Sequence, residues 1–144
     1  MIKVIYIDDE SDTEKMFSKF DIMLDSEIEV VKVAKVEKAL PMLDEHRGTV
    51  DLVVLDIIMP PEGFYSLEDT NGGTTTGLRL LKDIRKAYPE LPIIIVSVKR
   101  TQTAEDTAAE YGVADYLDKP VEAFEIAAAI VKVVASFRQR RPAK

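Results

Sequence analysis

The stretch "VDLVVLDIIMPPEGF", residues 50–64, decides the fold, because residues 52–59 form an apolar run with a single charged position. A strand without polar alternation is typical of a parallel sheet that is covered on both faces. One charged side chain, Asp56, interrupts the run, and an ionised carboxylate in apolar surroundings is costly unless something pairs with it. Asp56 therefore either ends a buried strand at the protein surface or is held at this position for chemistry.

Five short apolar runs, rich in β-branched residues, recur along the chain and are expected to be strands. They are residues 2–7, 28–33, 50–55, 92–98 and 113–117. Apolar residues at helical spacing predict helices around 16–24, 36–46, 77–87, 102–111 and 121–138. This alternation of strand and helix predicts an α/β fold with a doubly wound parallel sheet of five strands.

The composition is that of one ordinary globular domain, with 144 residues of which 47% are apolar and 31% charged. No apolar run reaches the length of a membrane span, and the first residues show neither a basic leader nor a cleavage site, so we expect a cytoplasmic location and no membrane contact. The lack of cysteine excludes disulfides and thiolate metal sites, and the single His46 excludes a multi-histidine site. A formal charge of -7 argues against direct binding to nucleic acid.

Polar side chains gather where the expected strands end. Asp8 and Asp9 follow the first strand and Asp56 follows the third. Ser97 lies near the end of the fourth, and Lys119 follows the fifth. Because the carboxyl ends of parallel strands lie on one edge of the sheet, where ligands bind, we expect these five side chains to converge.

Such a cluster has the parts that phosphoryl transfer needs. Neighbouring carboxylates repel one another unless a cation lies among them, and Mg²⁺ is usually held by one or two carboxylates together with a phosphate. Lys119 and Ser97 offer a charge and a hydroxyl to phosphoryl oxygens, and an aspartate can itself form an aspartyl phosphate. Each residue taken alone is better explained by structure, since acidic residues after a strand often cap a helix. The ordered set favours phosphoryl transfer onto Asp56.

The sequence resembles a response-regulator receiver domain, the phosphoacceptor part of two-component signalling. The matching motifs are "YIDDES", "LDIIMP", "IIIVS" and "GVADYLDKP", in this order along nearly the whole chain. The resemblance implies a flavodoxin-like sheet in the order 2-1-3-4-5, flanked by five helices. It also implies that residues 1–138 form a single receiver domain, followed by a basic tail at 139–144.

The resemblance implies a phosphorylation site at Asp56. This residue would accept a phosphoryl group from a histidine kinase or a phosphotransfer protein. Asp8, Asp9 and Asp56, together with the backbone carbonyl of Ile58, would hold Mg²⁺. The chain would not be a conventional enzyme, because it would catalyse only its own phosphorylation and perhaps its dephosphorylation.

The resemblance also implies a switch next to this site. Lys119 would pair with the phosphoryl group, Ser97 would turn toward it, and Tyr116 would swing inward as Ser97 moves. The alternative for Tyr116 is an ordinary tyrosine at the sheet edge. The Lys119–Pro120 bond would be cis, and the switched surface would bind a downstream protein target.

The sequence departs from the family pattern at three places. Val98 stands where the family usually has a very small residue, and Ile58 places an apolar side chain near the attacking water. Sixteen residues separate Pro60 from Gly77, where the family commonly has only a few, so an extended loop is expected at about 61–76.

The extended loop contains "GGTTTG", but Leu and Arg follow where a phosphate-binding loop requires Lys and Ser or Thr, so that reading is rejected. One of Thr74 to Thr76 is instead expected to cap the helix at 77–87. We expect the apolar residues of the loop to fold over or beside the site and to tune partner access. These residues are Phe64, Tyr65 and Leu67.

The helix at 121–138 is apolar on two faces. One stripe consists of Phe124, Ala128, Val131 and Ala135, and the other of Ile126, Ile130, Val133 and Phe137. One stripe can cover the sheet, and the other predicts a protein interface, such as a homodimer, unless the curvature of the sheet buries it too. The tail "RQRRPAK" is too short for a DNA-binding domain and is expected to be a frayed helix end or the start of a linker.

Two other functions compete with the phosphorylation switch. One is an aspartate-nucleophile phosphatase, which needs a second aspartate two residues after the nucleophile, where this chain has Ile58. The other is an interaction module that keeps the fold and is never phosphorylated. The intact set of Asp8, Asp9, Asp56 and Lys119 argues against that module.

Overall fold

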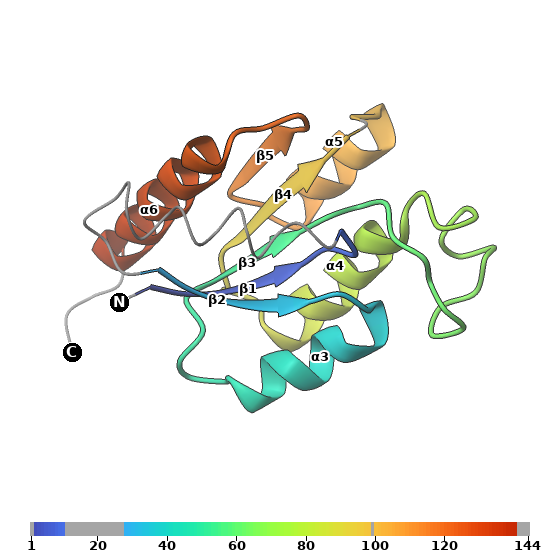
Figure 1. Ribbon diagram of the computed structural model, residues 1–144, viewed down its shortest axis with the longest axis horizontal. Coiled ribbons are helices and arrows are strands. Elements are labelled where there is room, and N and C mark those ends of the chain that lie inside the picture. The colour runs from blue at the N-terminus through green and yellow to red at the C-terminus, as the bar shows by residue number, and fades with distance from the viewer. Residues whose placement is uncertain (1, 11–27, 99, 141–144) are drawn as a thin grey trace.

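The sheet has the expected strand order. The computed structural model describes residues 2–10, 28–98 and 100–140. Five strands pair in parallel in the order β2-β1-β3-β4-β5, which confirms the predicted flavodoxin-like topology (Figure 1). The strands are β1 (Ile2–Ile7), β2 (Ile28–Val33), β3 (Leu52–Leu55), β4 (Ile93–Ser97) and β5 (Asp115–Asp118).

The described residues contain four helices rather than the expected five, because the helix expected around 16–24 lies outside the described residues. The four helices are α3 (Val36–Glu45), α4 (Thr76–Ala87), α5 (Gln102–Glu110) and α6 (Ala123–Arg140). None of them, in the part of the chain that the structure describes, combines the length and the hydrophobicity that crossing a bilayer requires.

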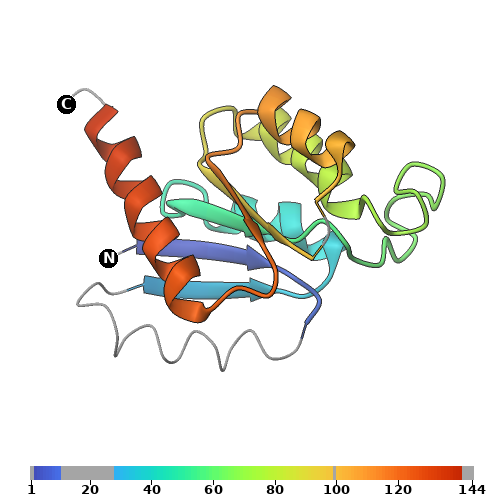
Figure 2. The ribbon, with the colours of Figure 1, turned by 90° about the horizontal axis from the view of Figure 1, so that it is seen from above.

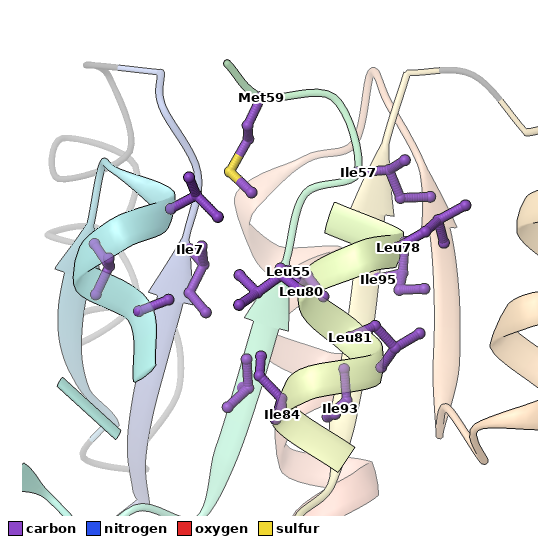
Figure 3. Packing of buried hydrophobic residues seen from close by; sticks show 14 of the residues in the cluster. Ile7, Leu55, Ile57, Met59, Leu78, Leu80, Leu81, Ile84, Ile93 and Ile95 are labelled. Atoms are coloured by element: carbon purple, nitrogen blue, oxygen red, sulfur yellow. The ribbon is translucent and has the colours of Figure 1, made fainter. Parts of the chain in front are cut away.

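The helices cover the sheet on both faces. Helices α3, α4 and α5 lie on one face and α6 on the other (Figure 2). Along β3 the side chains alternate between the two layers, since Leu55 packs toward α4 and Val54 toward α6. Leu80 and Ile84 of α4 fill the first layer with Leu55 (Figure 3). This double burial is why the central strands β3 and β4 are continuously apolar up to Ser97.

The junction between Asp56 and α4 depends on a glycine. The Gly77 amide donates a hydrogen bond to the Ile57 carbonyl at 2.8 Å. A Cβ atom on Gly77 would lie 2.0 Å from the Asp56 carbonyl oxygen, so the backbone of the helix approaches the end of β3 too closely for a side chain.

Thr75 occupies the N-cap position of α4, within the predicted range, but the predicted side-chain capping bond is wrong. The helix begins at Thr76, one residue earlier than expected, and the Thr75 side chain makes no capping bond. The buried Thr76 hydroxyl instead donates to the carbonyls of Met59 and Gly73. The threonine therefore fastens the incoming loop to the start of the helix, which satisfies loop carbonyls rather than helix amides.

The two apolar stripes of α6 have different surroundings. Ile126 and Ile130 are buried against the sheet, whereas Phe124, Ala128 and Ala135 are exposed. The stripe with Ile126 and Ile130 is therefore part of the core. Only the stripe with Phe124 and Ala128 is available as the interface that the sequence predicts.

Candidate functional site

Backbone bonds beyond the strand ends place the polar residues in register. The Asp56 amide donates to the Ile7 carbonyl at 2.9 Å, and the Asp8 amide donates to a β2 carbonyl at 3.0 Å. The Lys119 amide donates to the Ser97 carbonyl at 2.8 Å. Each ladder thus continues one residue past its strand, and Asp8, Asp56 and Lys119 reach the same edge with fixed backbones.

Three carboxylates meet at this edge, as the sequence predicts. Asp8, Asp9 and Asp56 each contribute an oxygen atom to a group in which all the atoms lie within 4.8 Å of one another. Asp8 and Asp56 are only 2% and 5% exposed, whereas Asp9 is exposed. Oxygen ligands at this spacing, open to solvent on one side, suit a hard divalent cation.

Lys119 joins the cluster from β5. Its ammonium nitrogen lies 3.1 Å from Asp8 Oδ2 and 3.2 Å from Asp56 Oδ2. Burial alone would lower the pKa of Lys119, but the carboxylates of Asp56 and Asp8 outweigh burial and raise that pKa. The lysine therefore remains charged at neutral pH, in contact with the carboxylate that we expect to react.

The neighbours of Asp56 act on its pKa in opposite directions. Burial raises the pKa of Asp56, the ammonium of Lys119 opposes this rise, and the carboxylate of Asp8 adds to it. The Ile58 amide donates to Asp56 Oδ1 at 3.3 Å and favours the ionised form. A cation bound among the carboxylates would favour ionisation further. The role of the Ile58 carbonyl as a metal ligand stays a prediction.

Ser97 and Tyr116 lie on the neighbouring strands, on the face covered by α4 and α5. Both hydroxyl groups are buried, and neither has a hydrogen-bond partner among the described residues. A buried hydroxyl without a partner is costly, and an acceptor that arrives at the strand edge would relieve that cost for Ser97. The Tyr116 hydroxyl already lies inside the protein in this structure, without a phosphoryl group on Asp56. A movement of the two residues on phosphorylation stays a prediction.

The remaining expectations concern the surroundings of Lys119. The Lys119–Pro120 peptide bond is cis. An open cavity of about 410 Å³ lies beside Lys119, and Val98 and Tyr6 help to line it. Val98 is exposed at this rim, so its side chain shapes the approach to the site rather than filling it.

Sequence reasoning missed two residues of the site. Glu10 Oε1 lies 3.2 Å from the Lys119 ammonium, and the Glu10 amide donates to Asp8 Oδ1 at 2.8 Å. The sequence feature that could have indicated Glu10 is its position directly after Asp8 and Asp9. The buried phenol of Tyr6 has its pKa raised by burial and then by Asp8, and its position two residues before Asp8 on the same side of β1 was the signal.

The loop at 61–75 lies beside the site rather than over it, at the amino-terminal end of α4 (Figures 1 and 2). Tyr65 turns toward α4, where its hydroxyl donates to Asp83 and its ring lies 4.9 Å from the Arg79 guanidinium. Phe64 and Leu67 are 44% and 67% exposed. Of the three residues expected near the site, one is therefore bound to α4 and two face solvent.

Comparison with known proteins identifies the family. The sequence profile of the response regulator receiver domain matches residues 4–131. The chain belongs to this family. A receiver domain protein from Clostridium thermocellum has the same fold, with a TM-score of 0.74, 26% identity, and coverage of 98% of this chain and 100% of that structure.

Curated relatives of this receiver domain are longer regulators. The transcriptional regulatory protein CitT of Bacillus subtilis is 30% identical over 85% of this chain and 48% of its own length. The DNA-binding transcriptional regulator NtrC of Rhizobium meliloti is 35% identical over 67% of this chain and 17% of its own length. The chain thus spans less than half the length of either relative.

Proposed function

We propose that this receiver domain accepts a phosphoryl group on Asp56 and that Lys119, Ser97 and a bound Mg²⁺ assist the transfer. The observation that supports this most is the position of the Lys119 ammonium, 3.2 Å from Asp56 Oδ2 inside a group of three carboxylates. A buried ion pair of this kind is weak evidence for stability, so its presence at an open edge favours a functional explanation.

The transfer is a displacement at phosphorus. An ionised Asp56 oxygen forms a bond to the phosphorus atom while the bond from phosphorus to the leaving group of the donor breaks, and the leaving group keeps that electron pair. Lys119 and the Ser97 hydroxyl donate hydrogen bonds to the phosphoryl oxygens as their charge rearranges. Lys119 is already charged and in place, so it needs little reorganisation.

Asp8, Asp9 and Asp56 are the residues that would hold Mg²⁺. The ion would neutralise charge on the phosphoryl oxygens during the transfer. Asp9 is exposed and Asp8 is buried against Lys119, so we propose that Asp9 offers the more accessible ligand and that Asp8 fixes both the ion and the lysine.

The proposed partners are a histidine kinase or phosphotransfer protein and a downstream protein target. The added charge on Asp56 would bias the surface around Ser97 and Tyr116 between two states. The open face of α6 around Phe124 and Ala128 is the place where a homodimer would form. The proposal makes the chain a switch that catalyses only reactions of its own aspartate.

The test is incubation with a small acyl phosphate and Mg²⁺, followed by intact mass measurement. We expect wild type to gain one phosphoryl group and Asp56→Asn to gain none. Asp51→Asn, at the opposite end of β3, is the matched control and should still be phosphorylated. Lys119→Met should slow the reaction by a factor of about 100, which is typical of removing one preorganised charge donor.

Other outcomes separate the competing functions. A wild-type protein that never gains the phosphoryl mass at any Mg²⁺ concentration would favour an interaction module that is not phosphorylated. Continuous release of phosphate from phosphate esters would favour the phosphatase. If both Asp51→Asn and Asp56→Asn gained a phosphoryl group, the acceptor would be a residue other than Asp56.

A further inference from the structure

Arg100 lies after β4 and reaches across to β5. Its guanidinium carbon lies 4.0 Å from the centroid of the Tyr116 ring. The same group donates to the Tyr116 carbonyl at 2.9 Å and to the Asp118 carboxylate at 3.1 Å. A guanidinium that stacks on a ring and is also bound to a carboxylate fixes a geometry more strictly than a single ion pair.

The Tyr116 ring packs against the apolar layer under α4 and α5, but its hydroxyl gains no bond there from the described residues. Its hydroxyl is buried and has no partner among the described residues, so the inward position offers no hydrogen bond to the phenol. An outward position would let water bond to the hydroxyl, which favours rotation. The stacked guanidinium of Arg100 opposes that rotation, because turning the ring would break the stacking contact.

Both ends of this contact are connected to the proposed phosphorylation site. Arg100 follows Ser97 by three residues, and Asp118 directly precedes Lys119. The Lys119 amide is also bonded to the Ser97 carbonyl. A displacement of Ser97 or Lys119 would therefore change the position of the guanidinium over the ring.

We propose that Arg100 is a positioning residue that holds the Tyr116 ring inward and couples the state of Asp56 to the surface around Tyr116. The holding of the ring stands on the contacts alone. The coupling rests on the proposed function, and the two parts are tested separately.

The first test measures the accessibility of Tyr116 without any phosphorylation. Tetranitromethane nitrates accessible phenols, and peptide mass spectrometry reports the rate at each tyrosine. We expect Arg100→Ala to accelerate nitration of Tyr116 about fivefold, the scale set by losing one cation–π contact, with Arg100→Lys between the two. Glu105→Gln, which alters a residue that Arg100 contacts only at 3.5 Å, should behave like wild type. A Tyr116 rate unchanged from wild type in Arg100→Ala would overturn the proposal.

Nitration of Tyr6 in the same samples reports folding, because Tyr6 is buried in the core. If Arg100→Ala exposes Tyr6 as well, Asp118→Asn replaces it, since that variant keeps the stacked cation and removes its carboxylate partner. A smaller acceleration at Tyr116 is then expected, and none would count against the proposal.

The second test repeats the measurement after treatment with the acyl phosphate and Mg²⁺. Phosphorylation should change the Tyr116 nitration rate in wild type, less in Arg100→Ala, and not at all in Asp56→Asn. An equal change in wild type and Arg100→Ala would overturn the coupling. A wild type that is not phosphorylated would overturn the proposed function, while the first test would still decide whether Arg100 holds the ring.

Discussion

Asp56, at the carboxyl edge of the sheet, and the loop at 61–75 both follow β3, but different hydrogen bonds hold them in place. At the edge, ladder hydrogen bonds fix the backbones of Asp8, Asp56 and Lys119, and their charged side chains contact one another directly. The loop is closed by its own hydrogen bonds, such as the Gly72 amide to the Leu67 carbonyl at 2.8 Å, and packs on α4. The edge is thus positioned by the whole sheet, and the loop by its own residues and one helix.

The difference teaches where changes in sequence can be tolerated. A residue at the edge is connected through backbone bonds to two strands, so an alteration there affects both the chemistry and the core. An alteration in the loop affects a local structure whose tip is solvated. The predictions below test this contrast at the junction, in the loop and at the edge.

The largest effect is expected at the junction. Gly77→Ala should lower the free energy of unfolding by about 3 kcal/mol, because the new methyl group overlaps the Asp56 carbonyl. Gly72→Ala is the control. A methyl group at this position would meet open space, so only the left-handed backbone of Gly72 disfavours it, and the substitution should cost about 1 kcal/mol. Urea denaturation measures both. Equal losses would show that the helix can move away from the strand.

The next effect concerns the hydroxyl that fastens the loop. Thr76→Val should lower the free energy of unfolding by about 2 kcal/mol, because the buried Met59 carbonyl loses its donor, whereas the Gly73 carbonyl keeps the Met59 amide. Thr76→Ser keeps the hydroxyl and should cost less than Thr76→Val. If serine and valine cost the same, the methyl group rather than the hydrogen bonds secures the loop.

At the site itself a substitution should stabilise the protein. Burial raises the pKa of Asp56 in the folded state, so the folded chain binds this proton more tightly than the unfolded chain, and stability falls as pH rises from about 4 through the raised pKa. Asp56→Asn should therefore stabilise the protein at pH 7, and this gain should shrink toward pH 4. Thermal unfolding across this pH range, without Mg²⁺, measures the effect.

Asp51→Asn should change the stability in the opposite direction to Asp56→Asn. The Asp51 carboxylate accepts a hydrogen bond from the Lys3 amide at 2.8 Å, so this substitution should destabilise the protein. A loss in both variants would mean that the pairing of Asp56 with Lys119 outweighs the burial of its charge.

The smallest effect is expected in the loop. Tyr65→Phe removes the hydroxyl that donates to Asp83 and should cost about 0.5 kcal/mol, because Asp83 keeps its ion pair with Arg79 at 2.7 Å. The rate of phosphorylation by the acyl phosphate should not change. A slower reaction would show that the loop reaches the site in solution.

The sheet order and the convergence of the site could be predicted, because both follow from patterns that are local in sequence. Continuous apolar runs identify covered parallel strands, and the residue after each run must lie at the same edge. The contact of Arg100 with Tyr116 could not be predicted, because a long side chain that crosses between strands has no periodic signal. The direction of Tyr65 depends in the same way on Asp83, eighteen residues further along the chain.

The closed form of the loop makes it a natural site for protein engineering. The Met59 amide bonds to the Gly73 carbonyl at 3.2 Å, so the chain leaves the core and returns to it at nearly one point. A peptide tag or a fluorescent reporter inserted among the solvated residues near Leu67 would be carried close to the proposed phosphorylation site without lengthening any element of the sheet. A receiver domain could in this way be made to report its own state.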